Sequence, residues 1–157
     1  MSLNIAPVYA KQFIRYAETW EAATDNQDGD IGVVEIPEFA VVAYATYAGA
    51  NKVCVPGDLT SFTGPIAGVN QSYIPTALAQ PHTARQASVA TSGSLIVEVS
   101  ASAVAAFTLN GRLSVGPDGK ALPTANGGVN VTLDGTTPLI REVVEIGGRT
   151  VVIASFA

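Results

Sequence analysis

The sequence predicts a mainly β protein, an antiparallel β-sandwich or barrel with an N-terminal arm or short helix. Two observations lead to this fold class. From residue 31 onward, short β-branched or aromatic segments follow one another, each bounded by Gly, Pro, Asn or Asp. Residues 7–23 follow a helical period instead, and residues 24–32, TDNQDGDIG, break that period and indicate a loop. We therefore expect an N-terminal arm or short amphipathic helix over residues 1–30 and a β-sandwich or barrel domain over residues 31–157.

The first segment carries four aromatic residues at spacings of four, three and four: Tyr9, Phe13, Tyr16 and Trp20. This spacing places them on one face of a helix, so we predict a short amphipathic helix over residues 7–23. The aromatic face either packs on the protein's own core or docks on a partner. In the second case these four residues form the interface, because buried aromatic side chains contribute much of the energy of an interface.

Short strands are predicted along the rest of the chain. In order they read IGVVEI, FAVVAYATY, NKVCV, GPIAGVN, QASVA, GSLIVEVS, AAFTL, RLSVG, KALPT, VNVTL, LIREVVEI and RTVVIASF. Strict alternation over residues 94–100 puts Leu95, Val97 and Val99 on one face, and the residues between them on the other. The alanine-rich residues 100–109 favour a short helical turn over one end of the sandwich, followed by strand.

Turn signals separate the C-terminal strands. In Pro117-Asp118-Gly119 the proline presets φ, the aspartate bonds locally and the glycine accepts a positive φ, so a hairpin is predicted. Asn110-Gly111 predicts a second tight turn, and Gly147-Gly148 predicts a two-residue hairpin turn.

Lys120 follows the Pro-Asp-Gly turn, which raises the alternative of a phosphate-binding loop. That motif needs four residues between its first Gly and the Gly-Lys pair, and a Ser or Thr after the Lys. Here two residues separate Gly116 from Gly119, and Ala121 follows the lysine. We therefore expect Lys120 to be a solvated residue beside a hairpin tip.

Composition restricts the partners. Charged residues make up 13% of the chain, against about 25% in typical soluble domains, so the surface is expected to be weakly charged and easily covered by neighbours. The eight Lys and Arg are scattered and the net charge is −5, which gives no electrostatic footprint for nucleic acid. The longest apolar run is about half the length that spans a bilayer, and the first residues lack an apolar signal-peptide core. No membrane partner is expected.

No catalytic or metal-binding constellation stands out. His82 is the only histidine, it follows Pro81 in an expected loop, and a metal site would need further ligands. Cys54 lies between two valines and is interpreted as a small buried hydrophobic residue. We expect no cofactor and no metal.

Acidic residues fit neither a calcium loop nor a glycosidase. The cluster of Asp25, Asp28 and Asp30 fails the EF-hand spacing. Three glutamates lie in predicted strands, where they are expected to point to water and to keep edges soluble: Glu98, Glu142 and Glu145.

The order of turns and strands over residues 64–157 is carried by GPIAGVNQSYIP, RQASVATSGSLIVEVS, LNGRLSVGPDGKALPT and PLIREVVEIGGRTVVIASF. This order resembles that of the small capsid decoration, or cement, proteins of tailed phages. Those proteins are compact β-barrels or sandwiches, often trimeric, that sit on the outside of the head shell and clamp neighbouring capsomers.

The resemblance implies a non-enzymatic structural protein on the capsid exterior of a virion, made in the host cytoplasm. It implies the major capsid protein as partner and a homo-oligomer, a trimer. Three alternatives stay open: another virion structural piece such as a tail, fibre or shell subunit; a carbohydrate-binding β-sandwich; and an enzyme that uses His82. The single tryptophan, Trp20, lies outside the expected β region, which counts against the carbohydrate-binding alternative.

Overall fold

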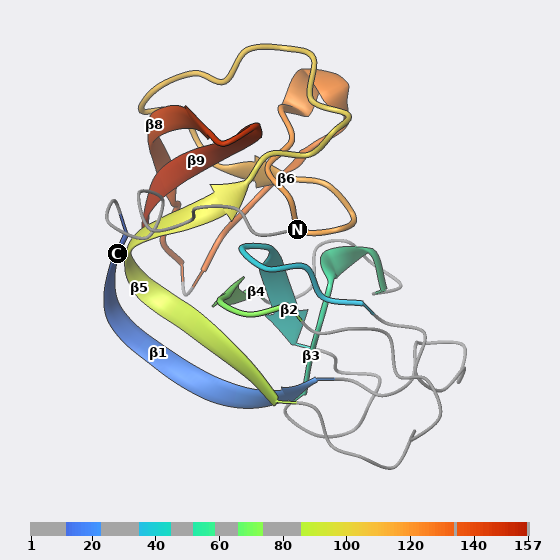
Figure 1. Ribbon diagram of the computed structural model, residues 1–157, viewed down its shortest axis with the longest axis vertical. Coiled ribbons are helices and arrows are strands. Elements are labelled where there is room, and N and C mark those ends of the chain that lie inside the picture. The colour runs from blue at the N-terminus through green and yellow to red at the C-terminus, as the bar shows by residue number, and fades with distance from the viewer. Residues whose placement is uncertain are drawn as a thin grey trace.

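The computed structural model describes residues 12–22, 35–44, 52–58, 66–73, 86–133 and 135–156. Over these ranges the chain is β structure with two short 3-10 helices, and α-helix is absent from them (Figure 1). The elements are β1 (Phe13–Ala22), β2 (Val41–Tyr44), β3 (Lys52–Cys54), η2 (Pro56–Asp58), β4 (Ile66–Asn70), β5 (Gln86–Glu98), β6 (Ser114–Val115), η3 (Thr124–Asn126), β7 (Val129–Asn130), β8 (Leu139–Ile146) and β9 (Arg149–Phe156).

One sheet of seven strands contains a closed ring. The strand order is β1-β3-β2-β4-β5-β9-β8, and β1 also pairs with β5, which closes the first five strands into a small barrel. Within the ring only the β1–β3 pair is parallel. Figure 1 shows β1 and β5 running side by side as two long curved strands. The prediction of a mainly β, antiparallel fold is confirmed.

Strand β5 joins the ring to the C-terminal hairpin. Its first residues pair with β1 and β4, and residues from Gly93 to Glu98 pair with β9. The segments QASVA and GSLIVEVS, expected as two strands, therefore form one strand of 13 residues. At Gly93 (φ 122°) a Cβ would lie 2.0 Å from the backbone oxygen of Phe13, so the close approach of β1 admits only glycine.

Buried side chains fall into two main cores and a small third one. The core inside the ring contains Ala22, Ile36, Val42, Val53, Cys54, Ala67, Ala87 and Val89. The larger core includes side chains of the ring strands β2, β4 and β5, of β6, β8 and β9, and of residues next to β6 and β7, among them Leu95, Val97, Val115, Val131 and Val152. A third cluster groups Phe39, Ile96, Val151 and Ile153. Both faces of the C-terminal half of β5 are thus covered, which explains an apolar Ile96 on the face opposite Leu95 and Val97.

Local turn chemistry is confirmed at the three predicted positions. At Asn110-Gly111, Asn110 has φ 62° and Gly111 N donates to the Thr108 oxygen at 3.0 Å. Gly147 and Gly148 connect β8 to β9 with φ of 57° and 80°, as a two-residue hairpin turn requires. At the Pro-Asp-Gly turn, Gly119 has φ 79° and Asp118 Oδ1 accepts the backbone N–H of Lys120 at 3.0 Å. The tip then docks on β2, because Val41 N donates to the Gly119 oxygen at 2.8 Å.

The helix expected over residues 7–23 is wrong for residues 13–22, which form strand β1. Its backbone pairs with β5 from Phe13 opposite Ser94 to Glu21 opposite Gln86, and this long-range ladder overrides the helical spacing. Aromatic residues suit strands as well as amphipathic helices, so the pattern did not discriminate. Residues 7–11 and the expected boundary at residue 30 lie outside the described residues.

The helical turn and strand expected within residues 100–109 are also wrong. This segment is an irregular loop. Its backbone is fixed by Asn126, whose Oδ1 accepts the N–H groups of Val104 and Ala105 at 3.1 and 2.9 Å. The side chain of a distant asparagine thus satisfies two donors that a helix would have used internally.

Candidate functional site

The aromatic residues proposed as an interface lie in two different environments. Phe13 and Tyr16 are 64% and 56% exposed, and Ile14 between them is 40% exposed. Trp20 is half-buried against the ring core, and its ring meets that of Tyr44 edge-on with centroids 5.1 Å apart. Tyr9 lies outside the described residues. The structure therefore separates Phe13 and Tyr16, which face solvent, from Trp20, which packs inward.

The exposed part of β1 is paired with another strand along only one of its two edges, among the described residues. Residues 13–21 pair with β5, whereas β3 pairs only with Glu21 and Ala22 on the opposite edge. Among the described residues, no strand pairs with that opposite edge over residues 13–20. We call Phe13, Ile14 and Tyr16 the β1 surface. An exposed edge with apolar side chains is a typical place for another chain to bind.

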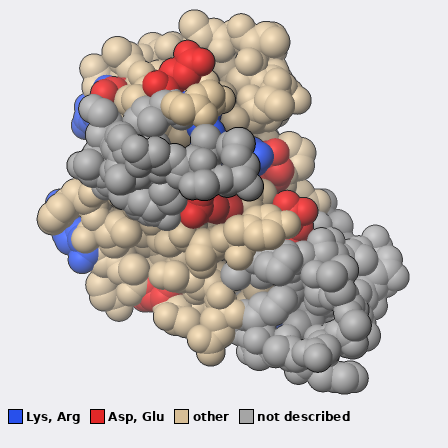
Figure 2. Space-filling view, in the orientation of Figure 1, with Lys and Arg blue, Asp and Glu red and all other residues tan. Residues whose placement is uncertain are grey.

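The molecular surface around these elements carries few charges. Figure 2 shows one face on which uncharged residues dominate and the basic and acidic residues form small, separate groups. This agrees with a chain in which charged residues are 13% of the total. A partner that covers such a surface has few charges to desolvate, which lowers the cost of association.

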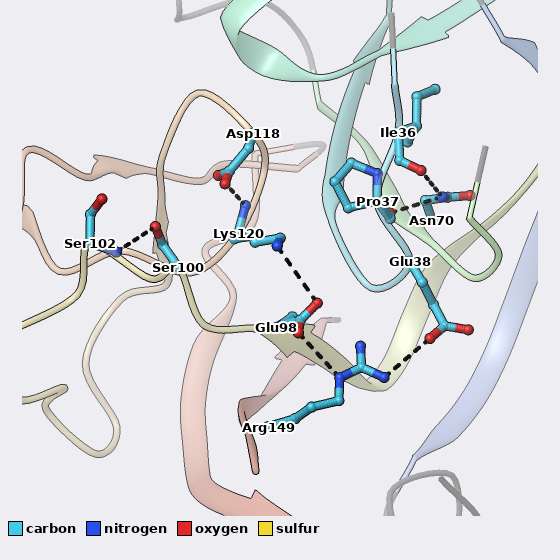
Figure 3. Close-up of polar contacts among 10 residues, drawn as sticks. All are labelled: Ile36, Pro37, Glu38, Asn70, Glu98, Ser100, Ser102, Asp118, Lys120 and Arg149. Carbon is cyan, nitrogen blue, oxygen red and sulfur yellow. Dashed lines mark hydrogen bonds and ion pairs between the residues drawn. The ribbon is translucent and has the colours of Figure 1, made fainter. Parts of the chain in front are cut away.

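A charged cluster lies where β5 ends and β9 begins. Arg149 donates through Nε to Glu98 Oε1 at 3.1 Å, and its Nη1 lies 3.5 Å from Glu38 Oε1 (Figure 3). The guanidinium carbon lies 5.7 Å from the centroid of the Phe39 ring. Lys120 Nζ reaches Glu98 Oε2 at 3.9 Å. We call Glu38, Glu98, Lys120 and Arg149 the Arg149 cluster.

Burial lowers the pKa of Arg149, but hydrogen bonds and charge from Glu98 and Glu38 raise it by more. The pKa of Arg149 therefore lies above its usual value, and the side chain keeps its positive charge.

Two sequence expectations are wrong here. Glu98 and Lys120 were expected to point freely into water, yet their side chains are only 21% and 29% exposed and they meet in the Arg149 cluster. The hairpin tip at Gly119 docks on β2 and brings Lys120 to the end of β5. One feature of the sequence could have indicated the cluster. Glu98 and Arg149 are charged residues at the ends of two apolar strands, in a chain in which charged residues are few.

A pocket of about 650 Å³ opens beside this cluster. Its charged lining is Glu98, Lys120 and Arg149, and the rest of the lining is largely apolar: Val99, Ala101, Ala103, Ala105, Ala106, Phe107 and Val143. Apolar walls with a few polar groups are the usual composition of ligand pockets. No sequence motif pointed to this pocket, because its lining comes from the loop over residues 99–107, the Pro-Asp-Gly hairpin and the β8–β9 hairpin.

The other candidate residues divide as follows. Cys54 is buried, as predicted. Glu142 and Glu145 are exposed on β8, also as predicted. His82 and the aspartate cluster, Asp25, Asp28 and Asp30, lie outside the described residues. Within the described part of the chain, no three His, Cys, Asp or Glu side chains gather as a metal site. In the same ranges, no helix has the length and apolar character to cross a membrane.

Comparisons of the chain with protein-family models, with curated proteins and with solved structures find no match. The two candidate sites are therefore defined by their residues alone: an exposed aromatic strand edge, and a largely apolar pocket whose lining includes three charged residues.

Proposed function

We propose that this chain is a non-enzymatic structural protein that binds the outside of a phage capsid and stabilises the shell by bridging neighbouring major capsid subunits. The β1 surface is the observation that carries the proposal. Phe13, Ile14 and Tyr16 are large apolar residues that face solvent on a strand with one unpaired edge among the described residues. Exposed apolar patches of this kind favour protein–protein contacts.

The scaffold behind this surface suits a mechanical role. The pairing of β1 with β5 runs from Phe13 to Glu21, so the aromatic side chains are held on a sheet rather than on a loose arm. A contact surface that is already ordered loses little conformational entropy on binding. A protein that bridges two subunits must resist deformation when they move apart. The hydrogen-bonded pairing of β1 with β5 provides that resistance behind the contact surface.

Self-association belongs to the same proposal. A decoration protein that sits where capsid subunits meet gains from matching their symmetry, and the resemblance in strand and turn order implies a trimer.

Trp20 packs against Tyr44 and is only partly exposed, so it does not form the open aromatic platform that a carbohydrate-binding sandwich would use.

Co-sedimentation with assembled empty head shells of the encoding phage tests the proposal. The wild-type chain is expected to pellet with shells and to raise their melting temperature. A Phe13→Ser/Tyr16→Ser double variant is expected to bind at least about thirtyfold more weakly, because a single interface aromatic contributes about 2 kcal/mol or more and such contributions are not additive.

The matched control is Tyr73→Ser, which removes another exposed tyrosine, 54% exposed, just after β4. It is expected to bind shells like the wild-type chain. If the wild-type protein stays in the supernatant at every shell concentration, capsid binding is refuted. If the Tyr73→Ser variant binds as weakly as the double variant, the assignment of the contact to the β1 surface is refuted.

A further inference from the structure

We propose that the pocket beside Arg149 binds a small carboxylate that carries an apolar group, with Lys120 as its anion contact. This site is separate from the β1 surface. None of its lining residues belongs to β1, and the inference does not depend on the proposed function.

The charges of the pocket favour an anion. Two cations, Lys120 and Arg149, line it together with one carboxylate, Glu98. Arg149 is held in place by Glu98 at 3.1 Å and by Glu38 at 3.5 Å (Figure 3). An amine ligand would meet two cations here. Glu38 balances the charge of the cluster but lies outside the lining, so the surface that an acid meets carries two cations and one carboxylate.

Lys120 is the group that can receive the acid. Its ammonium is 3.9 Å from Glu98 Oε2, the outer limit of an ion pair and longer than a hydrogen bond. Because the side chain is 29% exposed and ends a flexible stem, it can turn toward a ligand without disturbing the hairpin. Its own backbone N–H stays bound to Asp118 Oδ1.

The walls favour an apolar body next to the acid. Four alanines of the loop over residues 101–106, with Phe107 and Val143, surround the remaining space. The volume of about 650 Å³ falls within the range of small-molecule sites. Asn126 fixes this wall by accepting the N–H groups of Val104 and Ala105, so the pocket is formed before a ligand arrives.

Titration of the ¹⁵N-labelled full chain with phenylacetate, followed by amide chemical shifts, tests the site. Shifts are expected at Val99, Ala105, Gly148 and Thr150, with a Kd of about 1 mM or tighter. Phenylacetamide and phenethylamine, which keep the ring and lose the negative charge, are expected to bind at least about tenfold more weakly, because a hydrogen bond to a charged group contributes about 1.5–3 kcal/mol.

Variants separate the roles of charge and space. Lys120→Gln is expected to weaken phenylacetate binding about tenfold, whereas Lys52→Gln, the same change on β3 outside the pocket lining, leaves it unchanged. Ala105→Leu, which fills the pocket without altering charge, is expected to abolish the shifts. Amide spectra away from the pocket verify that each variant is folded.

A second arm identifies the source of the acid. Acetyl-Ala-Phe presents the same apolar carboxylate at a peptide end. Tighter binding of the peptide supports the site and assigns it to a chain terminus, and tighter binding of phenylacetate supports it and assigns it to a free acid. Absence of shifts with both probes at about ten times the expected Kd, equal binding of phenylacetamide, or unchanged binding by Lys120→Gln would overturn the inference.

Discussion

Tyr16 and Trp20 lie four residues apart on one strand, yet they have different roles. Trp20 packs on the ring core and donates its indole N–H to Glu18 Oε2 at 2.8 Å, whereas Tyr16 faces solvent. Two register shifts in β1, on either side of Tyr16, break the regular alternation between these positions. The residues that a helical spacing grouped together therefore do not act together.

Trp20→Ala is expected to lower the free energy of unfolding by about 2–3 kcal/mol, because it removes a half-buried indole from the ring core. Tyr16→Ala is expected to change it by less than about 0.5 kcal/mol. Urea denaturation followed by circular dichroism measures both. Equal losses in the two variants would contradict the division of the aromatic residues into core and surface.

Arg149→Met is expected to lower the free energy of unfolding by about 2 kcal/mol. The substitution leaves Glu98 and Glu38, both partly buried, without their shared cation, and the partial exposure of all three groups keeps the loss below that of a fully buried pair. Arg141→Met on β8 is the control, since Arg141 is exposed and contacts Asn110. Thermal and urea melts that show no difference between the two variants would exclude a stabilising role for the cluster.

At the scale of elements, local chemistry was predictable and long-range pairing was not. The turn at Gly147-Gly148 and the hairpin at Gly119 follow from residues within a few positions, and the structure confirms both. Strand β1 was not predictable, because its partner β5 begins 64 residues after β1 ends (86 − 22). The pocket was missed for the same reason, since three separate segments line it.

Gly93→Ala is expected to cost about 3 kcal/mol or more, because a methyl group there would press on the Phe13 oxygen and the φ of 122° disfavours alanine. Gly127→Ala is the control. Its φ is 96°, but nothing lies within 4 Å of the added Cβ, so a cost of only about 1 kcal/mol is expected. A Gly93→Ala variant as stable as Gly127→Ala would show that β1 is not held closely against β5.

At the scale of the whole molecule, three strands contribute side chains to both main cores: β2, β4 and β5. Val89 belongs to the ring core and Val97 to the larger core, and both residues lie on the same 13-residue strand. Separation of the two cores would disrupt β2 and β4, whose neighbouring residues are divided between the cores in the same way, as well as β5. The molecule is therefore expected to unfold as one unit.

Val89→Ala and Val97→Ala test this coupling. Each is expected to lower the free energy of unfolding by about 2 kcal/mol through lost apolar burial, and each variant is expected to keep a single calorimetric transition. Two resolved transitions, of which only one moves in each variant, would mean that the ring and the C-terminal half are independent folding units.

The backbone pairing of β1 with β5, in which Trp20 lies opposite Ala87, also affects how the chain folds during its synthesis. Strand β1 leaves the ribosome before β5, the strand that completes its hydrogen bonds, and such distant contacts form slowly. During that interval β1 can join the β5 of another nascent chain as well as its own, which is the route to an exchanged dimer. The spacing of chains along a messenger RNA thus bears on whether the ring closes within one molecule or between two.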